Sequence, residues 1–336
     1  MSDVVAETVG RGDLDELVRL VDGLCNSREW AEVVRLRDRC RLALERGLQL
    51  WPAAEYAEYR LALDAPGDFA GPMVREGSGR FALGPLWEVA ASTHDWETLA
   101  PHIPDGPMRA MAAHERVMRG EDLSDAVGID PWVLEVPLCL ESWEPAYPPA
   151  VYRPDKADFP TPLLPSLDLA QLPQPGDEIE DEESVEALYD LGRSWVEQSN
   201  GEGSAVAVAG GALEAIALFG HDEVRIGAVE PAAALAWMAW ASASGGAYGR
   251  RSGAPSGRFA AWWAAAMLCG LEWPPDPDEL GEEINRLEWH LWEPPGLIGG
   301  WALHLATADP VDGISWAVSA FDTYREDDPN RPNDED

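Results

Sequence analysis

The chain has 336 residues, of which 46% are hydrophobic and 16 are tryptophan, a composition typical of globular folding in about two domains. Its 61 acidic residues outnumber 24 lysines and arginines, so the formal net charge is −37. This balance argues against direct nucleic-acid binding and against anionic membrane surfaces, because both need clustered positive charge. The negative charge would instead keep the protein soluble or attract a basic protein partner.

Three features of the sequence favour a cytoplasmic location. The four cysteines have no CxxC spacing and are too few for a disulfide scaffold, so we expect reduced thiols. The first residues carry acids and no apolar leader, which argues against a signal peptide. A charge-free stretch at 231–248 is rich in alanine, serine and glycine, and it predicts a buried helix in place of a membrane span.

Residues 1–129 are predicted to form a helical-hairpin domain. Apolar residues recur at helical spacing on both sides of a break at Asn26 and Ser27, so 12–47 should form a hairpin that Gly47 closes. Another helix is expected at 52–63. Small polar residues and an acid precede Trp30 at the start of a helix, and the same pattern precedes Trp96. This repeat favours a solenoid-like antiparallel array over 12–120. The alternative is a plain helical bundle in which this repeat of the sequence pattern is accidental.

Residues 130–183 are predicted to be a connector. The segment 132–140 alternates as an edge strand would, with Pro137 lacking a backbone donor. A proline-rich stretch and the acidic run 177–183 follow, and both are typical of extended surface chain. The domain boundary is placed here.

Residues 184–324 are predicted to form an α+β domain. Helices are expected at 184–199, 205–219, 231–242 and 258–271. Alternating segments at 287–292, 302–307 and 314–319 predict a small antiparallel meander. The acidic tail 325–336 should be disordered. The fold class of the whole chain is therefore α+β and mostly helical.

The strongest candidate site is the Gly-Arg loop, residues 245–257, together with the helix that follows it. Glycine-rich backbone, the start of a helix and several guanidinium groups are the parts of an anion-binding site. Ser256 is the expected N-cap of that helix. The predicted anion-binding residues are Arg250, Arg251, Ser252, Gly253, Ser256, Gly257 and Arg258. Alternatively, the arginines pair with the protein's own acids and the loop only connects two helices.

Histidines supply a second, weaker candidate. If the meander pairs as predicted, Glu288, His290 and His304 share one face of the sheet, as a metal or acid–base cluster would. The alternative is two ordinary half-exposed histidines, and no metal site is assigned. The sequence has no GxSxG elbow, no Walker A loop and no GxGxxG fingerprint, so no catalytic residue and no cofactor are assigned.

Two stretches, LWPAAEYAEYRLALDAP at 50–66 and GAYGRRSGAPSGRFAAWWA at 246–264, resemble segments of a family of uncharacterised actinobacterial proteins. The similarity runs along most of the chain. It implies a bacterial cytosolic setting and no activity.

The leading hypothesis is a non-enzymatic interaction or regulatory protein. Its helical N-terminal half would offer a groove to a protein partner, for which a basic protein is one candidate, and its α+β half would carry the anion-binding Gly-Arg loop. The first alternative is an enzyme or sensor for a phosphorylated or nucleotide-like ligand at Arg250, Arg251 and Arg258. The second alternative is an acidic, immunity-type inhibitor of a basic protein. No nucleic-acid partner and no membrane are expected.

Overall fold

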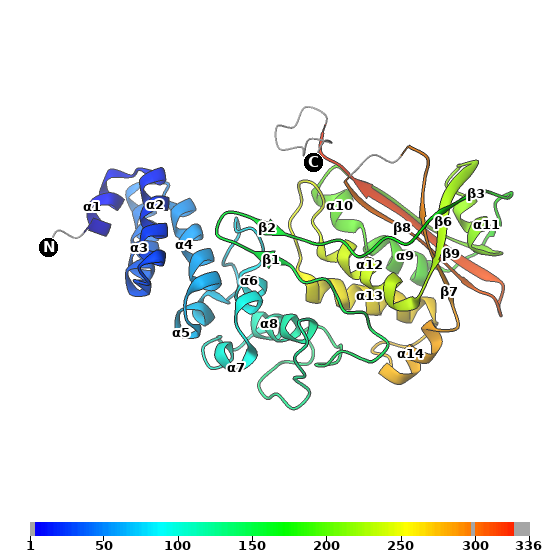
Figure 1. The fold of residues 1–336 in the computed structure, drawn as a ribbon, viewed down its shortest axis with the longest axis horizontal. Coiled ribbons are helices and arrows are strands. Elements are labelled where there is room, and N and C mark those ends of the chain that lie inside the picture. Colours follow the sequence, from blue (N-terminus) through cyan, green and yellow to red (C-terminus); the bar gives the residue numbers. More distant parts are fainter. Residues whose placement is uncertain (1–3, 297–299, 326–336) are drawn as a thin grey trace. The chain divides into compact units, whose positions relative to one another are not determined.

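The computed structural model describes residues 4–296 and 300–325, and the chain divides into two compact units (Figure 1). The N-terminal unit comprises Met1–Leu134, Leu138–Leu140 and Pro149–Pro160. The C-terminal unit comprises Glu135–Pro137, Glu141–Pro148 and Thr161–Asp336. Helices dominate the first unit and a sheet with helices forms the second, so the predicted α+β, mostly helical class is confirmed.

The N-terminal unit is an array of short helices. They are α1 (Val4–Arg11), α2 (Leu14–Asn26), α3 (Trp30–Ala43), α4 (Trp51–Asp64), α5 (Gly67–Ala70), α6 (Leu86–Thr93), α7 (Trp96–Leu99) and α8 (Pro107–Met118), with 3-10 turns η1 (Leu44–Arg46) and η2 (Gly71–Met73). A two-stranded antiparallel ladder, β1 (Val151–Tyr152) and β2 (Ala157–Asp158), completes the unit.

Neighbouring helices in the chain pack on one another, as the helical array requires. Helices α2 and α3 both contact α4, α4 contacts α6, and α6 contacts α8. The predicted 12–47 hairpin is present, and Gly47 follows η1 in the left-handed region at φ 79°. The repeated pattern before Trp96 precedes only α7, a helix of four residues. The second occurrence of the pattern therefore does not form a hairpin like the first.

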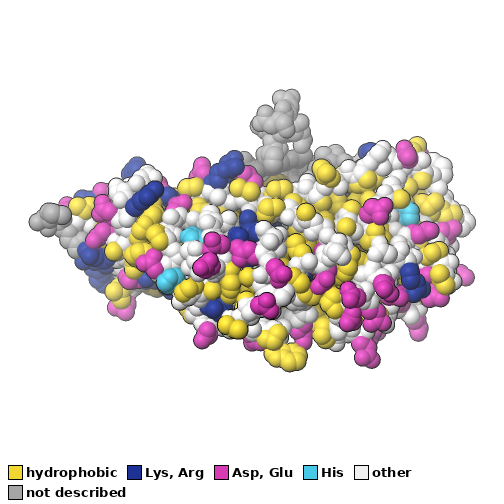
Figure 2. Space-filling view, turned by 60° about the horizontal axis from the view of Figure 1, so that its bottom comes forward, with side chains coloured by type: hydrophobic (Ala, Val, Ile, Leu, Met, Phe, Trp, Pro, Cys, Tyr) yellow, Lys and Arg dark blue, Asp and Glu magenta, His cyan; other side chains and the backbone are white. Residues whose placement is uncertain are grey.

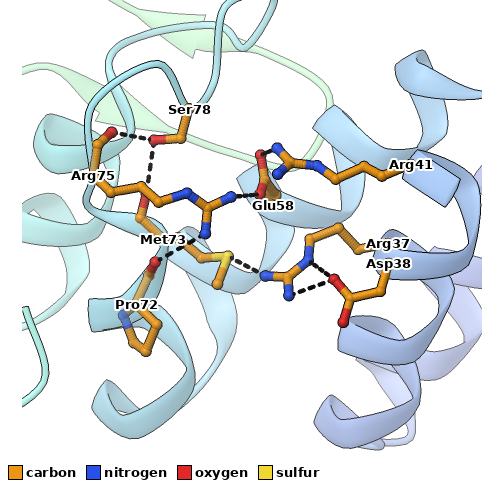
Figure 3. A network of polar contacts seen from close by, with 8 residues as sticks. All are labelled: Arg37, Asp38, Arg41, Glu58, Pro72, Met73, Arg75 and Ser78. Atoms are coloured by element: carbon orange, nitrogen blue, oxygen red, sulfur yellow. Dashed lines mark hydrogen bonds and ion pairs between the residues drawn. The ribbon is translucent and has the colours of Figure 1, made fainter.

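Helix α4 is the centre of this unit and buries a charge. Glu58 has no solvent exposure, yet it lies among the alanines and leucines that α4 packs inward. Arg41 and Arg75 each reach one of its two oxygens at 2.6 Å (Figure 3). Burial raises the pKa of Glu58, and the two guanidinium charges oppose that rise. The pairing thus makes an acid tolerable in an apolar helix.

The C-terminal unit combines a sheet with helices. Its helices are α9 (Glu182–Asp190), α10 (Arg193–Gln198), α11 (Ala212–Ala217), α12 (Pro231–Ala243), α13 (Ala254–Leu268) and α14 (Pro277–Ile284). Its strands are β3 (Asp168–Gln171), β4 (Asp177–Glu178), β5 (Glu202–Ala209), β6 (Glu223–Val229), β7 (Glu288–Glu293), β8 (Trp301–Asp309) and β9 (Ile314–Asp322).

Within the described ranges these strands form one seven-stranded antiparallel sheet in the order β3-β6-β7-β8-β9-β5-β4. Helix α11 covers one face, where Ala215 and Ile216 pack on Val208 and Trp292. The region of α9 and α10 covers the other face, and Trp316 Nε1 donates to Asp181 Oδ2 at 2.7 Å there. Helix α12 packs on β7 and β8 and also on α13.

The predicted β7–β9 meander is present, but the sheet is larger than expected because β5 and β6, together with the short edge strands β3 and β4, also belong to it. The helix predicted at 205–219 is wrong, since Ala205–Ala209 lies in β5 and only Ala212–Ala217 is helical. In β5, Val206 and Val208 alternate with alanines, and pairing with β9 along eight residues outweighs the helix propensity of alanine. Strand β6 has no counterpart among the predicted elements.

The predicted connector, 130–183, takes part in both units. The edge strand predicted at 132–140 is wrong: the segment forms turns, with Glu135 at φ 55°, and the Pro137 carbonyl accepts a side-chain donor instead of a strand. Farther along, β3 and β4 form the two edges of the large sheet. The segment therefore completes the C-terminal sheet, and the predicted α+β domain begins before 184. Of the predicted disordered tail at 325–336, only Arg325 lies inside the described residues.

The charge-free stretch at 231–248 forms α12 and the start of the Gly-Arg loop, as a packed helix would. Across residues 4–296 and 300–325, no helix has both the length and the apolar run needed to cross a bilayer.

Gly257 provides a test of how closely α12 and α13 pack. A Cβ at this position would overlap the carbonyl oxygen of Ala239 on α12. We expect Gly257→Ala to lower stability by about 1–3 kcal/mol, because backbone must move to make room. Calorimetric melting would measure the change. Gly23→Ala is the control, since a Cβ there meets no atom within 4 Å and the interior of α2 favours alanine. An unchanged melting temperature in Gly257→Ala would contradict the close approach.

Candidate functional site

The Gly-Arg loop is closed by the protein's own acceptors and donors. Ala247 N–H donates to Asp322 Oδ2 at 2.6 Å, and Tyr248 N–H donates to Ser199 Oγ at 3.0 Å. Gly246 has φ 69°, and a Cβ on it would overlap the Asp322 carboxylate. Asp322 is fully buried at the end of β9. This end of the loop backbone therefore binds an aspartate of the same chain, and binding of an external anion by the loop stays a prediction.

The serines and glycines at the start of α13 stabilise the loop itself. The helix begins at Ala254 after Gly253, which has φ 94° and serves as N-cap, so the N-cap predicted at Ser256 is wrong. Ser252 Oγ donates to the Ser242 carbonyl at 2.7 Å, and Ser256 Oγ donates to the Ser252 carbonyl at 3.2 Å. These hydroxyls connect the loop to the end of α12.

The three arginines do not share one environment. Arg250 is exposed and Arg251 is half-buried on the loop. Arg258 lies on the fifth residue of α13 with no solvent exposure. The structure therefore separates Arg258 from the solvent that an external anion would arrive from, whereas binding by Arg250 and Arg251 stays a prediction.

Arg258 forms a fully buried ion pair with Glu144. Its Nη2 donates to Glu144 Oε1 at 2.6 Å and its Nε donates to Oε2 at 2.8 Å, a two-point contact. Its Nη1 donates to the Pro137 carbonyl at 2.7 Å. Neither side chain of the pair is exposed to solvent. The guanidinium is thus neutralised and satisfied inside the C-terminal unit.

Further donors complete the shell around the Glu144 carboxylate. Trp262 Nε1 and the Tyr147 hydroxyl donate to Oε2 at 2.9 Å and 2.8 Å. Burial alone would raise the pKa of Glu144, but the hydrogen bonds and charge of Arg258 outweigh it and hold that pKa below its usual value. Burial raises the pKa of the Tyr147 hydroxyl well above its usual range. The cluster is therefore a structural clamp in which Arg258, Trp262 and Tyr147 all donate to one buried carboxylate.

Sequence reasoning did not identify Glu144 or Tyr147, because both lie in the proline-rich stretch that looked like exposed chain. One signal was available: the segment SWEPAY places a single acid between Trp143 and Tyr147, an apolar setting in which a carboxylate needs a cation.

Glu288, His290 and His304 share one face of the sheet, as predicted. The register pairs His290 with Ala306, two residues from His304, and Glu288 with Ala308. This face packs on α11, and the His304 ring lies 4.7 Å from the Trp292 ring, between centroids. Burial lowers the pKa of His304 to about 4 and also lowers that of His290. In the described part of the chain, no three histidine, cysteine or acidic residues are grouped to hold a metal ion.

An open groove of the C-terminal unit is formed by residues outside the predicted sites. It has a volume of about 790 Å³ and lies between α9, α13 and the segment after α13. Its lining residues are Glu183, Glu186, Ala187, Asp190, Phe259, Trp263, Met267, Gly270, Leu271, Glu272 and Trp273. Aromatic rings and carboxylates therefore meet in one open concavity.

Comparison with known proteins gives a family and no activity. Residues 3–301 match a family described as a family of unknown function (DUF6183). No curated protein and no solved structure matches the chain. The match names no organism, so the actinobacterial origin stays a prediction.

The Glu144–Arg258 pair predicts a large loss of stability when one partner is removed. We expect Glu144→Ala or Arg258→Ala to lose about 3–5 kcal/mol, because each leaves a buried charge without its partner. Urea unfolding followed by tryptophan fluorescence measures the loss. The double variant Glu144→Leu with Arg258→Met should recover part of it, since it leaves no buried charge. A loss below about 1 kcal/mol in both single variants would contradict the clamp.

His304 predicts an acid-sensitive C-terminal unit. The unfolded chain binds a proton at this residue near pH 6.5, whereas the folded protein does so near pH 4. The unfolded state therefore binds more protons between these values, and stability falls as the pH drops from 6.5 to 4. The loss should reach about 3 kcal/mol at most. Melting temperatures across this range should flatten in His304→Gln, and an unchanged slope in that variant would contradict the assignment.

Proposed function

Because the chain belongs to this family of unknown function, we propose its role from its own geometry: a non-enzymatic, cytoplasmic interaction protein whose partner is a basic protein. The observation that carries the proposal is the groove between α9 and α13, where three aromatic rings lie among four carboxylates. Cys25, Cys40 and Cys269, which form no disulfide with any residue that the structure describes, support the cytoplasmic setting.

The aromatic floor of the groove is held in place by ring–ring contacts. The Trp273 ring lies 5.2 Å from Phe259 and 5.3 Å from Trp263, both in edge-to-face arrangements. Trp273 Nε1 also donates to Glu135 Oε2 at 3.0 Å. Because α13 presents Phe259 and Trp263 one turn apart, the rings form a fixed surface and lose little freedom on binding.

The rim of the groove is negative. Glu183, Glu186 and Asp190 come from α9, and Glu272 follows α13. Arg193 pairs with Glu186 at 2.9 Å and with Asp190, so it offsets one of the four charges. Within the described ranges, Glu183 and Glu272 form no ion pair, and both are exposed.

This combination fits a lysine or arginine side chain. A cation over a tryptophan face gains about 0.5–2 kcal/mol, and nearby carboxylates add to the attraction. Acidic side chains are spread over the face of the molecule drawn in Figure 2, and the net negative charge would also speed the approach of a basic partner. A basic enzyme held inactive in this way is one form of such a partner.

The alternative of an enzyme or sensor for a phosphorylated ligand has less support. Its third arginine, Arg258, would have to leave Glu144 and expose both buried charges. A screen of nucleotides by thermal shift tests Arg250 and Arg251 separately.

We expect a fluorescein-labelled nona-arginine peptide to bind the full chain in 150 mM NaCl, measured by anisotropy. Trp263→Leu and the double variant Glu183→Gln with Glu272→Gln should each weaken binding by about tenfold, since each removes one part of the groove. The matched control is Glu45→Gln with Asp312→Asn, which removes the same charge from exposed sites elsewhere.

If the control weakens binding as much as the groove variants, the peptide is attracted by net charge alone and the groove is not the site. If the peptide does not bind at all, the proposal of a basic partner is wrong.

A further inference from the structure

The N-terminal unit holds a second aromatic pocket, separate from the proposed function. It has a volume of about 410 Å³ and is formed by the start of α4, the segment 81–83 and the turn between β1 and β2. Its walls include Trp51, Glu55, Tyr56, Tyr59, Phe81 and Asp155. Four aromatic rings and two carboxylates thus line one cavity.

The rings form fixed walls because their other groups are engaged. The Trp51 and Phe81 ring centroids are 4.5 Å apart at an interplanar angle of 41°. The Tyr56 hydroxyl donates to Asp22 Oδ1 at 2.6 Å, and the Tyr59 hydroxyl donates to the Arg153 carbonyl at 2.5 Å. The phenols therefore offer the pocket no free hydroxyl donor, and the Arg60 guanidinium already lies 5.7 Å from the centroid of the Tyr56 ring. Trp51 and Phe81 remain 40% and 64% exposed, so apolar ring surface is available to a ligand.

The charge in the pocket is negative and incompletely compensated. Glu55 Oε2 is buried, and among the described residues it has no hydrogen-bond partner. Asp155 supplies a second, exposed carboxylate. The nearest basic residues of the β1–β2 turn, Arg153 and Lys156, both contact Asp158. A buried carboxylate oxygen without a partner is costly, and a bound cation would remove that cost.

These observations select one class of ligand. An anion would be repelled, and a neutral apolar ligand would leave the Glu55 carboxylate desolvated. A primary ammonium needs several hydrogen-bond acceptors, whereas rings line most of this pocket. We propose that the pocket binds an alkylated ammonium group, whose methyl surface packs on the rings while its charge faces Glu55 and Asp155. The group belongs either to a small molecule such as choline or to a methylated lysine side chain.

Isothermal titration of the full chain with choline chloride tests the proposal, and 3,3-dimethylbutan-1-ol serves as its uncharged isostere. We expect choline to bind at least roughly tenfold more tightly than the alcohol, because only choline carries a charge that is attracted to the aromatic rings and to the carboxylates. A peptide containing trimethyllysine, compared with the same unmethylated peptide, distinguishes the two sources of the group. Tighter binding of the methylated peptide than of choline assigns the pocket to a protein partner.

Trp51→Leu and Glu55→Gln should each reduce choline affinity by about tenfold without lowering the melting temperature below that of the parent by more than a few degrees. Trp263→Leu, in the other unit, is the matched control and should leave choline binding unchanged while weakening the nona-arginine peptide. Equal affinity for choline and the alcohol, or no heat from either ammonium probe, would overturn the proposal. Choline binding that Trp263→Leu abolishes would also overturn it, because the ligand would then occupy the groove.

Discussion

The structure of the C-terminal unit depends on one buried ion pair, Arg258 with Glu144. Both partners are fully buried, and every nitrogen of the guanidinium is given an acceptor by the carboxylate or by the Pro137 carbonyl. Two charges in an apolar interior are tolerable only with such complete pairing. The pair therefore joins residues 137 and 144 to α13, from more than a hundred positions away in the chain, and α13 in turn carries the aromatic floor of the groove.

The same use of arginine recurs in the N-terminal unit. Arg41 and Arg75 neutralise the buried Glu58, and Arg119 pairs with Glu115, which is 1% exposed. Arg41, Arg75, Arg119 and Arg258 thus each pair with a carboxylate that the fold has buried. Other carboxylates line both concave aromatic regions. The sequence suggested that Arg258 could bind an external anion, but Glu144 already compensates its charge. The ligands that fit the two concave regions are therefore cationic.

Much of the fold followed from local pattern. Apolar residues at helical spacing identified the 12–47 hairpin, and strict alternation identified the β7–β9 meander, because each element buries one face of fixed period. The alanine-rich β5 was misassigned, since alanine favours a helix locally and only its pairing with β9 makes it a strand. The contact of the Gly-Arg loop with Asp322 could not be predicted, because the two lie about 75 positions apart in the chain.

The sequence by itself determined the class of the fold, the strongly negative charge and the positions of the glycines that permit close approach at Gly246 and Gly257. These properties depend on composition and on neighbours along the chain. Only the tertiary structure decided which acids face which arginines, that the proline-rich segment supplies both edges of the sheet, and that distant tryptophans and carboxylates share a groove. Ion pairs and pockets join residues far apart in the chain, and such contacts leave no periodic signal in the sequence.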